Sequence, residues 1–184
     1  MKKIFILGFG GSLRKGSFSK AILMEALNHV PEGASLEIFE IGGIPEFNQD
    51  MEKDPPKVIR DFKAKIRAAD AILISTPEYN YSVPGFLKNA IDWASRPYGD
   101  NAFQGKPVGI MSSSIAGAGG SRAQYHLRQI FVFLDMHPLN KPEVIVPEVH
   151  QKVDNEGNVT DQHTKEKIGE LVQALVKWAG KLQG

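Results

Sequence analysis

Residues 4–19 have the sequence IFILGFGGSLRKGSFS, and this stretch decides the fold class of the 184-residue chain. Its first part, residues 4–9, is a short apolar run, which is typical of a β-strand buried on both faces of a sheet. Glycines and hydroxyl side chains follow, and an amphipathic pattern begins near Ser17, as at the start of a helix. A buried strand, a glycine-rich turn and a helix predict the first unit of an α/β domain with a parallel sheet.

The same alternation of short apolar runs and amphipathic segments continues along the chain. Two further apolar runs, residues 71–75 and 108–111, are bounded by turn signals and are expected to be buried strands. Residues 35–41 alternate polar and apolar side chains, and Pro147 interrupts residues 143–149, so we expect both segments at sheet edges. Apolar stripes at helical spacing lie between and after these runs, in residues 22–30, 58–69, 86–94, 127–134 and 168–176.

Five strands that alternate with five helices predict a three-layer sandwich, a parallel sheet with helices on both faces. Right-handed crossovers make the flavodoxin-like strand order 2-1-3-4-5 the usual arrangement of such a five-stranded sheet. No repeat, low-complexity tract or linker divides the chain, so residues 1–184 are expected to form one domain. Pro84 is expected in the first turn of the third helix, with Ser82 as the N-cap candidate.

Composition excludes several classes of protein. The chain has 22 Lys and Arg against 21 Asp and Glu, which gives no electrostatic reason to bind nucleic acid or an anionic membrane. It has no cysteine, which excludes disulfides, thiolate metal sites and cysteine nucleophiles, so a redox function would need a borrowed redox group. With no secretory signal and no apolar run of about 18 residues, we expect a cytoplasmic protein that neither enters nor crosses a membrane.

In open parallel sheets, ligands bind beyond the carboxyl ends of the strands, where the strand order reverses. Three loops are expected there, at residues 10–19, 76–83 and 112–120. They are also the loops richest in Gly, Ser, Asn and Tyr, residue types that allow tight turns, hydrogen bonds and aromatic contacts. The chemistry of this chain is therefore expected at these three loops.

The first loop has the features of a phosphate site. Its glycines allow a tight turn, its hydroxyls and helix-start amides can donate to an anion, and Arg14 and Lys15 add positive charge. Ser17 stands where the lysine of a nucleotide-binding P-loop would be, and Leu13 replaces a glycine of the dinucleotide fingerprint. The loop therefore favours a monophosphate bound without metal, as in FMN. A plain strand-to-helix turn with Ser17 or Ser19 as N-cap is the alternative.

The other two loops have the features of a site for a flat ring. Tyrosines, prolines and an asparagine in residues 77–85 offer aromatic faces and fixed polar groups, although such tyrosines could equally be core lids or partner contacts. Residues 112–120 are mostly Ser, Ala and Gly, small enough for the polar edge of a ring to approach main-chain N–H groups. A flexible connector is the alternative for this third loop.

Three motifs in these regions resemble the NADPH-dependent FMN reductase family, and within it the flavin quinone reductases also described as chromate or azo reductases. They are GSLRKGSF at residues 11–18, PEYNYSVPG at 77–85 and LKNAIDW at 87–93. GGSRAQYHLRQ at residues 119–129 and NKPE at 140–143 extend the resemblance over nearly the whole chain. The resemblance implies a flavodoxin-like fold, non-covalently bound FMN, NAD(P)H as co-substrate, and a homodimer or a dimer of dimers.

Carried over position by position, the resemblance implies FMN contacts in all three loops. The residues expected to hold the phosphate, or to surround it, are Ser12, Arg14, Lys15, Gly16, Ser17, Phe18 and Ser19. The residues expected around the ring are Pro77, Glu78, Tyr79, Asn80, Tyr81, Ser114 and Gly117. Ser19 departs from the family pattern, in which asparagine is frequent, but either side chain can serve the loop.

The implied activity is transfer of two electrons from NAD(P)H through FMN to quinones or similar acceptors, such as azo compounds, chromate or free flavin, by a ping-pong mechanism. Main-chain N–H groups near Asn80 or Ser114 are expected to stabilise negative charge on the reduced flavin. A flavodoxin-like electron-transfer or flavin-binding protein without NAD(P)H turnover is the alternative. The near-neutral charge favours the enzyme, because flavodoxins tend to be acidic.

No catalytic acid or base and no metal ligand is assigned. The G-x-S-x-G elbow of serine hydrolases is incomplete at both places where it begins, and the five histidines lack metal-ligand spacing. Arg122, Tyr125 and Glu143 form a polar and aromatic set that could line a subunit contact, the rim of the site, or plain solvated surface.

Overall fold

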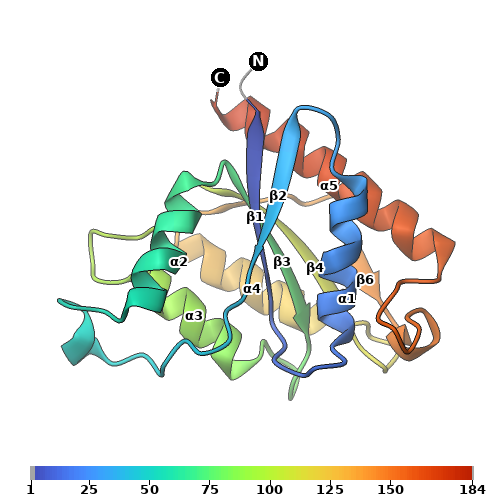
Figure 1. The fold of residues 1–184 in the computed structure, drawn as a ribbon, viewed down its shortest axis with the longest axis horizontal. Coiled ribbons are helices and arrows are strands. Elements are labelled where there is room, and N and C mark those ends of the chain that lie inside the picture. Colours follow the sequence, from blue (N-terminus) through green and yellow to red (C-terminus); the bar gives the residue numbers. More distant parts are fainter. Residues whose placement is uncertain (1–2, 184) are drawn as a thin grey trace.

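A parallel sheet lies between two layers of helices in the computed structural model, which describes the backbone of residues 3–183 (Figure 1). Its four long strands, in sheet order, are β2 (Ala34–Phe39), β1 (Ile4–Gly10), β3 (Ala71–Pro77) and β4 (Pro107–Ser113). The fifth position, beside β4, holds two short strands, β5 (His137–Pro138) and β6 (Val144–Val146). The predicted order 2-1-3-4-5 is confirmed.

The fifth strand is split rather than continuous. β5 pairs with β4 at its first residues, Pro107 and Val108, whereas β6 pairs with its last three. We expected a single edge strand over residues 143–149, but only three of them pair with β4. Pro147 follows β6 directly, and a proline has no N–H to continue the ladder, so the strand ends there.

Helices cover both faces of the sheet, as predicted. The α-helices are α1 (Phe18–Glu25), α2 (Lys57–Ala68), α3 (Gly85–Ser95), α4 (Ser121–Phe133) and α5 (Gln162–Gln183), and short 3₁₀ turns lie at Ala26–His29, Gln49–Met51 and Val149–Gln151. One face is covered by α1 and α5, and the other by α2, α3 and α4 (Figure 1). Among the described residues, no helix is long and apolar enough to cross a membrane.

The central strands are apolar on both faces because each face has its own core. Successive side chains of a strand point to opposite faces, so Ile6 joins the core beneath α1 and α5. Its neighbour Leu7 joins the core beneath α2, α3 and α4. In that second core, the Phe9 and Phe62 rings meet edge to face with centroids 5.2 Å apart. Burial on both sides explains why these strands have continuous apolar runs.

β3 and β4 continue beyond their apolar residues. We expected them to end at Ser75 and Met111, but each extends two residues further, to Pro77 and Ser113. The additional hydroxyl residues are buried, and two of them have internal acceptors, since Thr76 Oγ1 donates to Pro77 O and Ser112 Oγ donates to Gly119 O, both at 2.8 Å. An apolar pattern does not detect strand residues of this kind, and they carry both strands into the functional loops.

The helix starts agree with expectation at α1 and differ at α3. Ser17 is the N-cap of α1, because its Oγ accepts a hydrogen bond from Lys20 N–H at 3.1 Å. Ser82, the N-cap candidate for α3, does not cap it. Pro84 occupies the N-cap position of α3, one residue earlier than expected, and Ser82 Oγ instead shares a 2.8 Å hydrogen bond with His126 Nδ1.

An ion network joins α2 to the segment between α3 and β4. The buried Lys63 ammonium donates to Asp100 Oδ2 at 2.7 Å and to the carbonyl of Arg96, and Arg67 donates to the other oxygen of Asp100. These contacts, led by the hydrogen bond from Lys63, hold the pKa of the Asp100 carboxyl below its ordinary value. Folding therefore favours the ionised form of Asp100.

Replacing Asp100 with Asn should lower the free energy of unfolding at neutral pH by about 1–2 kcal/mol, because the buried Lys63 ammonium loses its charged acceptor. The loss is no larger than this because the Asp100 carboxylate is half exposed, so solvent screens the interaction. Since the folded-state pKa is depressed, this stability is present above the ordinary value of 3.8 and is lost as the pH falls through the lowered pKa. Urea unfolding from pH 7 to pH 3 should show the difference between variant and parent shrinking. Asp61→Asn, at an exposed pair on α2, is the matched control, and an equal loss there would contradict the prediction.

Candidate functional site

The loops that follow β1, β3 and β4 meet at the carboxyl edge of the sheet and enclose a cavity of about 360 Å³. The first loop and the start of α1 contribute Ser12, Arg14, Ser17, Phe18 and Ser19 to its lining. The second and third loops and the 3₁₀ turn after β6 contribute Pro77, Glu78, Tyr79, Ser113, Ser114, Ile115 and Val149. The cavity therefore lies where the strand order reverses.

The first loop is fixed against the end of β3. Gly11 N–H donates to Ser75 O at 2.7 Å, and Ser75 Oγ donates to Ser19 O, also at 2.7 Å. A Cβ atom at Gly11 would lie only 2.7 Å from Thr76 Oγ1, so no larger residue fits there without a shift. The close approach of these two backbones places the first loop beside the second.

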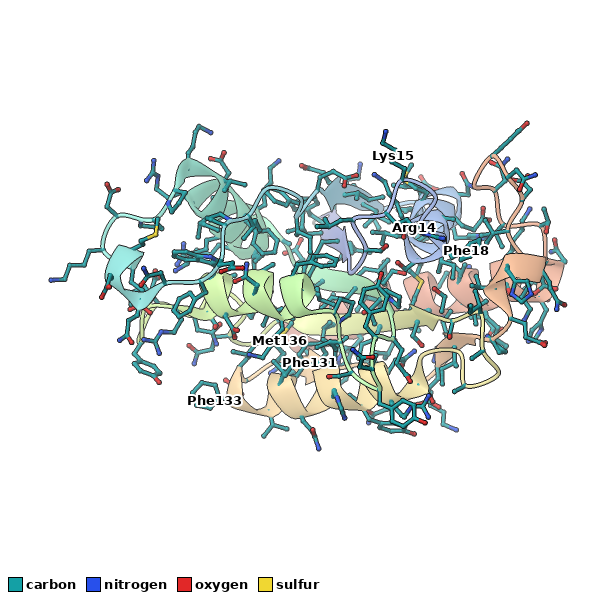
Figure 2. All side chains as sticks on the ribbon, turned by 90° about the horizontal axis from the view of Figure 1, so that it is seen from below. Arg14, Lys15, Phe18, Phe131, Phe133 and Met136 are labelled. Atoms are coloured by element: carbon teal, nitrogen blue, oxygen red, sulfur yellow. The ribbon has the colours of Figure 1, made fainter. Side chains whose placement is uncertain are left out.

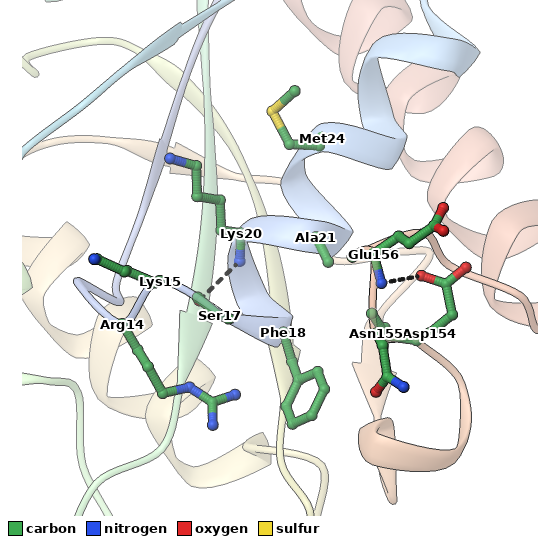
Figure 3. Close-up of a pocket in the computed structure, with 13 residues that line it drawn as sticks. Arg14, Lys15, Ser17, Phe18, Lys20, Ala21, Met24, Asp154, Asn155 and Glu156 are labelled. Atoms are coloured by element: carbon green, nitrogen blue, oxygen red, sulfur yellow. Dashed lines mark hydrogen bonds between the residues drawn. The ribbon is translucent and has the colours of Figure 1, made fainter.

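The start of α1 can hold an anion. Ser17 is buried, and its Oγ caps Lys20 N–H and shares a 3.1 Å hydrogen bond with Ser19 Oγ. The N–H groups of Phe18 and Ser19, in the first turn of α1, have no acceptor within the helix and are free to bind an anion. The Arg14 guanidinium lies 4.8 Å from the centre of the Phe18 ring, which places its charge beside this helix start (Figure 3).

The second loop is a rigid two-residue turn. Tyr79 and Ser82 exchange both backbone hydrogen bonds, each 2.9 Å long. Asn80 and Tyr81 between them have φ values of 49° and 64°, as in the type I′ turns of tight hairpins. Positive φ is uncommon for tyrosine, so the surrounding structure must hold this turn in place.

Contacts from α4 hold the turn. Arg122 Nε donates to Glu78 Oε1 at 2.6 Å, and the Arg122 guanidinium lies 3.8 Å from the centre of the Tyr81 ring. His126, one turn further along α4, shares its hydrogen bond with Ser82 Oγ. Because Glu78 lines the cavity, Arg122 lies at the rim of the site, which was one of the interpretations left open for it.

The third loop is held between α4 and the edge strand. Gln124 Nε2 donates to Ser112 Oγ at 2.9 Å and to Val144 O at 2.8 Å. A Cβ atom at Gly119 would lie 2.5 Å from Ile145 Cγ2, and its φ of +58° also favours glycine. Among the described residues, Gln124 Oε1 is the one buried side-chain polar atom without a hydrogen-bond partner.

The expected N–H donors of the second and third loops differ in availability. Ser114 N–H donates to Val146 O at 3.1 Å, so it is already engaged in extending the β6 pairing. The N–H groups of Ile115 and Asn80, by contrast, have no acceptor within the described part of the chain. If main-chain donors serve a ligand here, Ser114 N–H is therefore not one of them, whereas Ser114 Oγ still lines the cavity.

Most of the predicted site residues meet in this cavity, and a few do not. Lys15 and Gly16 line a neighbouring cavity of about 400 Å³ instead, which shares Arg14, Ser17 and Phe18 with the first. The predicted residues that line neither cavity are Asn80, Tyr81 and Gly117. The lining residues that sequence reasoning missed are Ser113, Ile115 and Val149. Ser113 and Ile115 flank a predicted residue, but nothing in the sequence connects Val149 with the loops.

The neighbouring cavity lies between α1 and a turn at residues 153–157 (Figure 3). Asp154 Oδ1 closes the turn by accepting hydrogen bonds from the N–H groups of Glu156 and Asn158, at 2.9 and 2.8 Å. These bonds, the one from Asn158 first, lower the pKa of the Asp154 carboxyl. Figure 3 shows Arg14 and Lys15 extending in different directions from the loop, with Arg14 on the Phe18 side.

The main cavity thus combines an anion site with a flat, partly aromatic wall. Hydroxyls, helix-start amides and Arg14 suit a phosphate group held without metal, and the rigid turn beside Tyr79 suits a planar ring. Across residues 3–183, no group of three or more His, Asp or Glu side chains is arranged to hold a metal ion. Flavin mononucleotide has both a phosphate group and a planar ring, which are the two groups that this cavity can bind.

Fold and cavity define a flavodoxin-like α/β protein with a strand-end site for a phosphate-bearing planar ligand. The family model described as NADPH-dependent FMN reductase matches residues 4–151. The chain is 51% identical over 183 residues to an NAD(P)H-dependent FMN reductase of Pseudomonas aeruginosa, with 98% of both chains covered. It therefore belongs to the NADPH-dependent FMN reductase family, as the motifs predicted.

Two further relatives agree. The chain is 44% identical over 188 residues to an NAD(P)H:quinone oxidoreductase of Solanum tuberosum, covering 98% of this chain and 95% of the relative. Among solved structures it is similar to FerB, a flavoenzyme NAD(P)H:(acceptor) oxidoreductase of Paracoccus denitrificans, with a TM-score of 0.86 and 35% sequence identity. That match covers 97% of this chain and 98% of FerB.

Two glycines of the first loop should respond differently to a methyl group. Gly11→Ala should lower the free energy of unfolding by about 1–3 kcal/mol, because the new Cβ meets Thr76 Oγ1 and forces the loop away from β3. Gly16→Ala should change it by less than about 1 kcal/mol, since nothing lies within 4 Å of the added atom. Urea denaturation of both variants measures the difference, and equal losses would show that the Gly11 contact is unimportant.

Proposed function

We propose that this chain binds FMN non-covalently in the strand-end cavity and catalyses two-electron transfer from NAD(P)H to quinones or similar acceptors, including azo compounds, chromate and free flavin. The observation that carries this proposal is that one cavity joins the anion-binding start of α1 to a rigid aromatic turn. Membership of the FMN reductase family supports the same function.

In this proposal the first loop binds the phosphate. The N–H groups of Phe18 and Ser19 and the hydroxyls of Ser12 and Ser17 donate to its oxygens, and Arg14 neutralises its charge. Arg14 is suited to this because its contact with Phe18 fixes the guanidinium beside the helix start. Gly16 leaves the loop open, and Lys15 adds positive charge from the adjoining cavity.

The second and third loops hold the planar ring. Pro77, Glu78 and Tyr79 form one side of the cavity, and Ser114 forms the other. Asn80 and Tyr81 shape the turn, and the N–H groups of Asn80 and Ile115 can donate to the polar edge of the ring. Small residues around Gly117 keep the third loop clear of that edge.

Bound FMN supplies the two-electron carrier, and the residues around it bind, orient and tune it. Tyr79 is 48% exposed and Ile115 is 66% exposed, so the cavity opens directly to solvent between the second and third loops. An open face of this kind admits NAD(P)H and an oxidised acceptor one after the other, which supports a ping-pong order. No side chain of the lining is needed as an acid or base.

Purified protein should be yellow, and anaerobic NADPH or NADH should bleach its flavin absorbance at a rate sufficient for turnover with a quinone. Stopped-flow spectroscopy followed by steady-state kinetics with both nicotinamides provides the measurement. A protein that binds FMN but stays oxidised with NAD(P)H would instead be a flavodoxin-like electron carrier. A colourless protein that FMN cannot reconstitute would contradict both functions.

We also propose that the chain acts as a homodimer or a dimer of dimers, as the family resemblance implies. Supporting this, α4 exposes Val132 and Phe133, which are 82% and 78% accessible, and Tyr98, which lines the same surface cavity as Phe133, is 75% accessible. Figure 2 shows Phe133 projecting from the end of α4, away from the sheet, whereas Phe131 points toward it. Large apolar side chains exposed together are typical of interaction surfaces.

Phe133→Glu should reduce the mass measured by light scattering, because a carboxylate cannot be buried against a second copy without a large desolvation cost. Leu182→Glu, at an exposed leucine of α5 on the other side of the sheet, is the control and should leave the mass unchanged. An unchanged mass for Phe133→Glu would place the subunit contact elsewhere.

Two broader features belong to the proposal. We propose that residues 1–184 act as a single domain, because strands drawn from residues 4–146 share one sheet and α5 packs on it. A cytoplasmic location is proposed because NAD(P)H, the reductant of the proposed reaction, is supplied there.

A further inference from the structure

A second cavity, of about 490 Å³, lies between α2, the carboxyl end of α3 and residues 52–55. Its lining shares no residue with the strand-end cavity. The residues of α3 and the following loop that line it, from Trp93 to Asp100, lie at the far end of that helix from the functional turn. Nothing in the proposed electron transfer uses it.

Positive charge is concentrated in this second cavity. Five cations and two carboxylates line it, namely Lys53, Arg60, Lys63, Arg67 and Arg96 with Glu52 and Asp100. The whole chain, by comparison, has a net charge of only +1. These seven residues carry a net charge of +3, which Asp54 reduces by pairing with Arg60 at 3.3 Å, and the remaining local excess is enough to attract an anion.

The carboxylates neutralise this charge only in part. Asp100 is shared between Lys63 and Arg67, and Glu52 Oε1 accepts from Arg96 Nε at 2.6 Å. Lys63 is 95% buried, yet only two of the three hydrogens of its ammonium group have acceptors among the described residues. A buried cation with a spare donor is stabilised by any further anionic oxygen that reaches it.

The floor of the cavity is apolar. Pro55 and Pro97 line it and are half-buried, so they present apolar surface, whereas Ile59 and Trp93 are almost completely buried and Lys53 and Arg60 are exposed at its edge. The Trp93 indole N–H already donates to Pro45 O at 2.8 Å, so the indole offers the cavity no hydrogen-bond donor. An apolar floor beneath a cationic rim suits a ligand with an apolar body and an anionic group.

We propose that this second cavity binds an aromatic phosphomonoester, with the ring against Pro55 and Pro97 and the phosphate among Arg60, Lys63 and Arg67. Arginine favours phosphate because its planar guanidinium can donate two parallel hydrogen bonds. The volume of about 490 Å³ admits a bicyclic ring with its phosphate. The site is independent of the proposed function, because the two cavities share no residue.

Calorimetric titration of the FMN-loaded protein with 1-naphthyl phosphate tests the proposal, with inorganic phosphate and 1-naphthol as comparison ligands. We expect one molecule bound per chain, with an affinity that falls as salt rises and exceeds that of either comparison ligand. The flavin absorbance should stay unchanged during the titration. A perturbed flavin spectrum with one equivalent bound would place the probe at the strand-end cavity, and absence of binding would equally overturn the proposal.

Charge variants then locate the site. Lys53→Gln with Arg60→Gln removes two exposed cations of the rim and should weaken binding roughly fivefold or more, whereas Asp100→Asn removes a competing carboxylate and should strengthen it. The matched control is Lys57→Gln with Lys65→Gln, two α2 lysines that do not line the cavity. Equal weakening in the control pair, or no weakening in the rim pair, would refute the assignment even if Asp100→Asn proved too unstable to measure.

Discussion

The close contact between the first loop and the end of β3 is the constraint on which the site depends. Gly11 N–H and Ser19 O are both bonded to Ser75, so one residue of β3 fixes the entry and exit of the loop. The absence of a Cβ at Gly11 is what permits this approach. Because the contact orients the start of α1, it also determines where the Phe18 and Ser19 N–H groups can meet an anion.

Helix α4 is the second support of the site. Its first turns hold the Tyr79–Ser82 turn through Arg122 and His126, and hold the third loop through Gln124. Tyr81 of the turn is thereby kept in a conformation that a tyrosine would rarely adopt alone. A helix outside the cavity thus keeps two of its three loops rigid, so that the site can be formed before a ligand arrives.

Charge in this protein is local rather than global. A net charge of +1 conceals a basic helix start at one edge of the sheet and a cluster of cations between α2 and α3. At both places the cations lie beside apolar or aromatic surface, namely Phe18 in one and Pro97 in the other. Composition alone therefore says little about which anions such a chain can bind. Salt screens electrostatic interactions beyond about one Debye length, so an anion responds to the charges near it rather than to the net charge of the chain.

The sequence by itself determined the buried strands, the helix start near Ser17, the three strand-end loops and the family, because these depend on short apolar runs, local turn signals and contiguous motifs. It could not determine the split of the edge strand, the bond between Ser82 and His126, or the place of Val149 in the cavity lining. These are contacts between residues far apart in the chain. Only the tertiary structure decided them, since packing of the helices on the sheet sets which distant side chains meet.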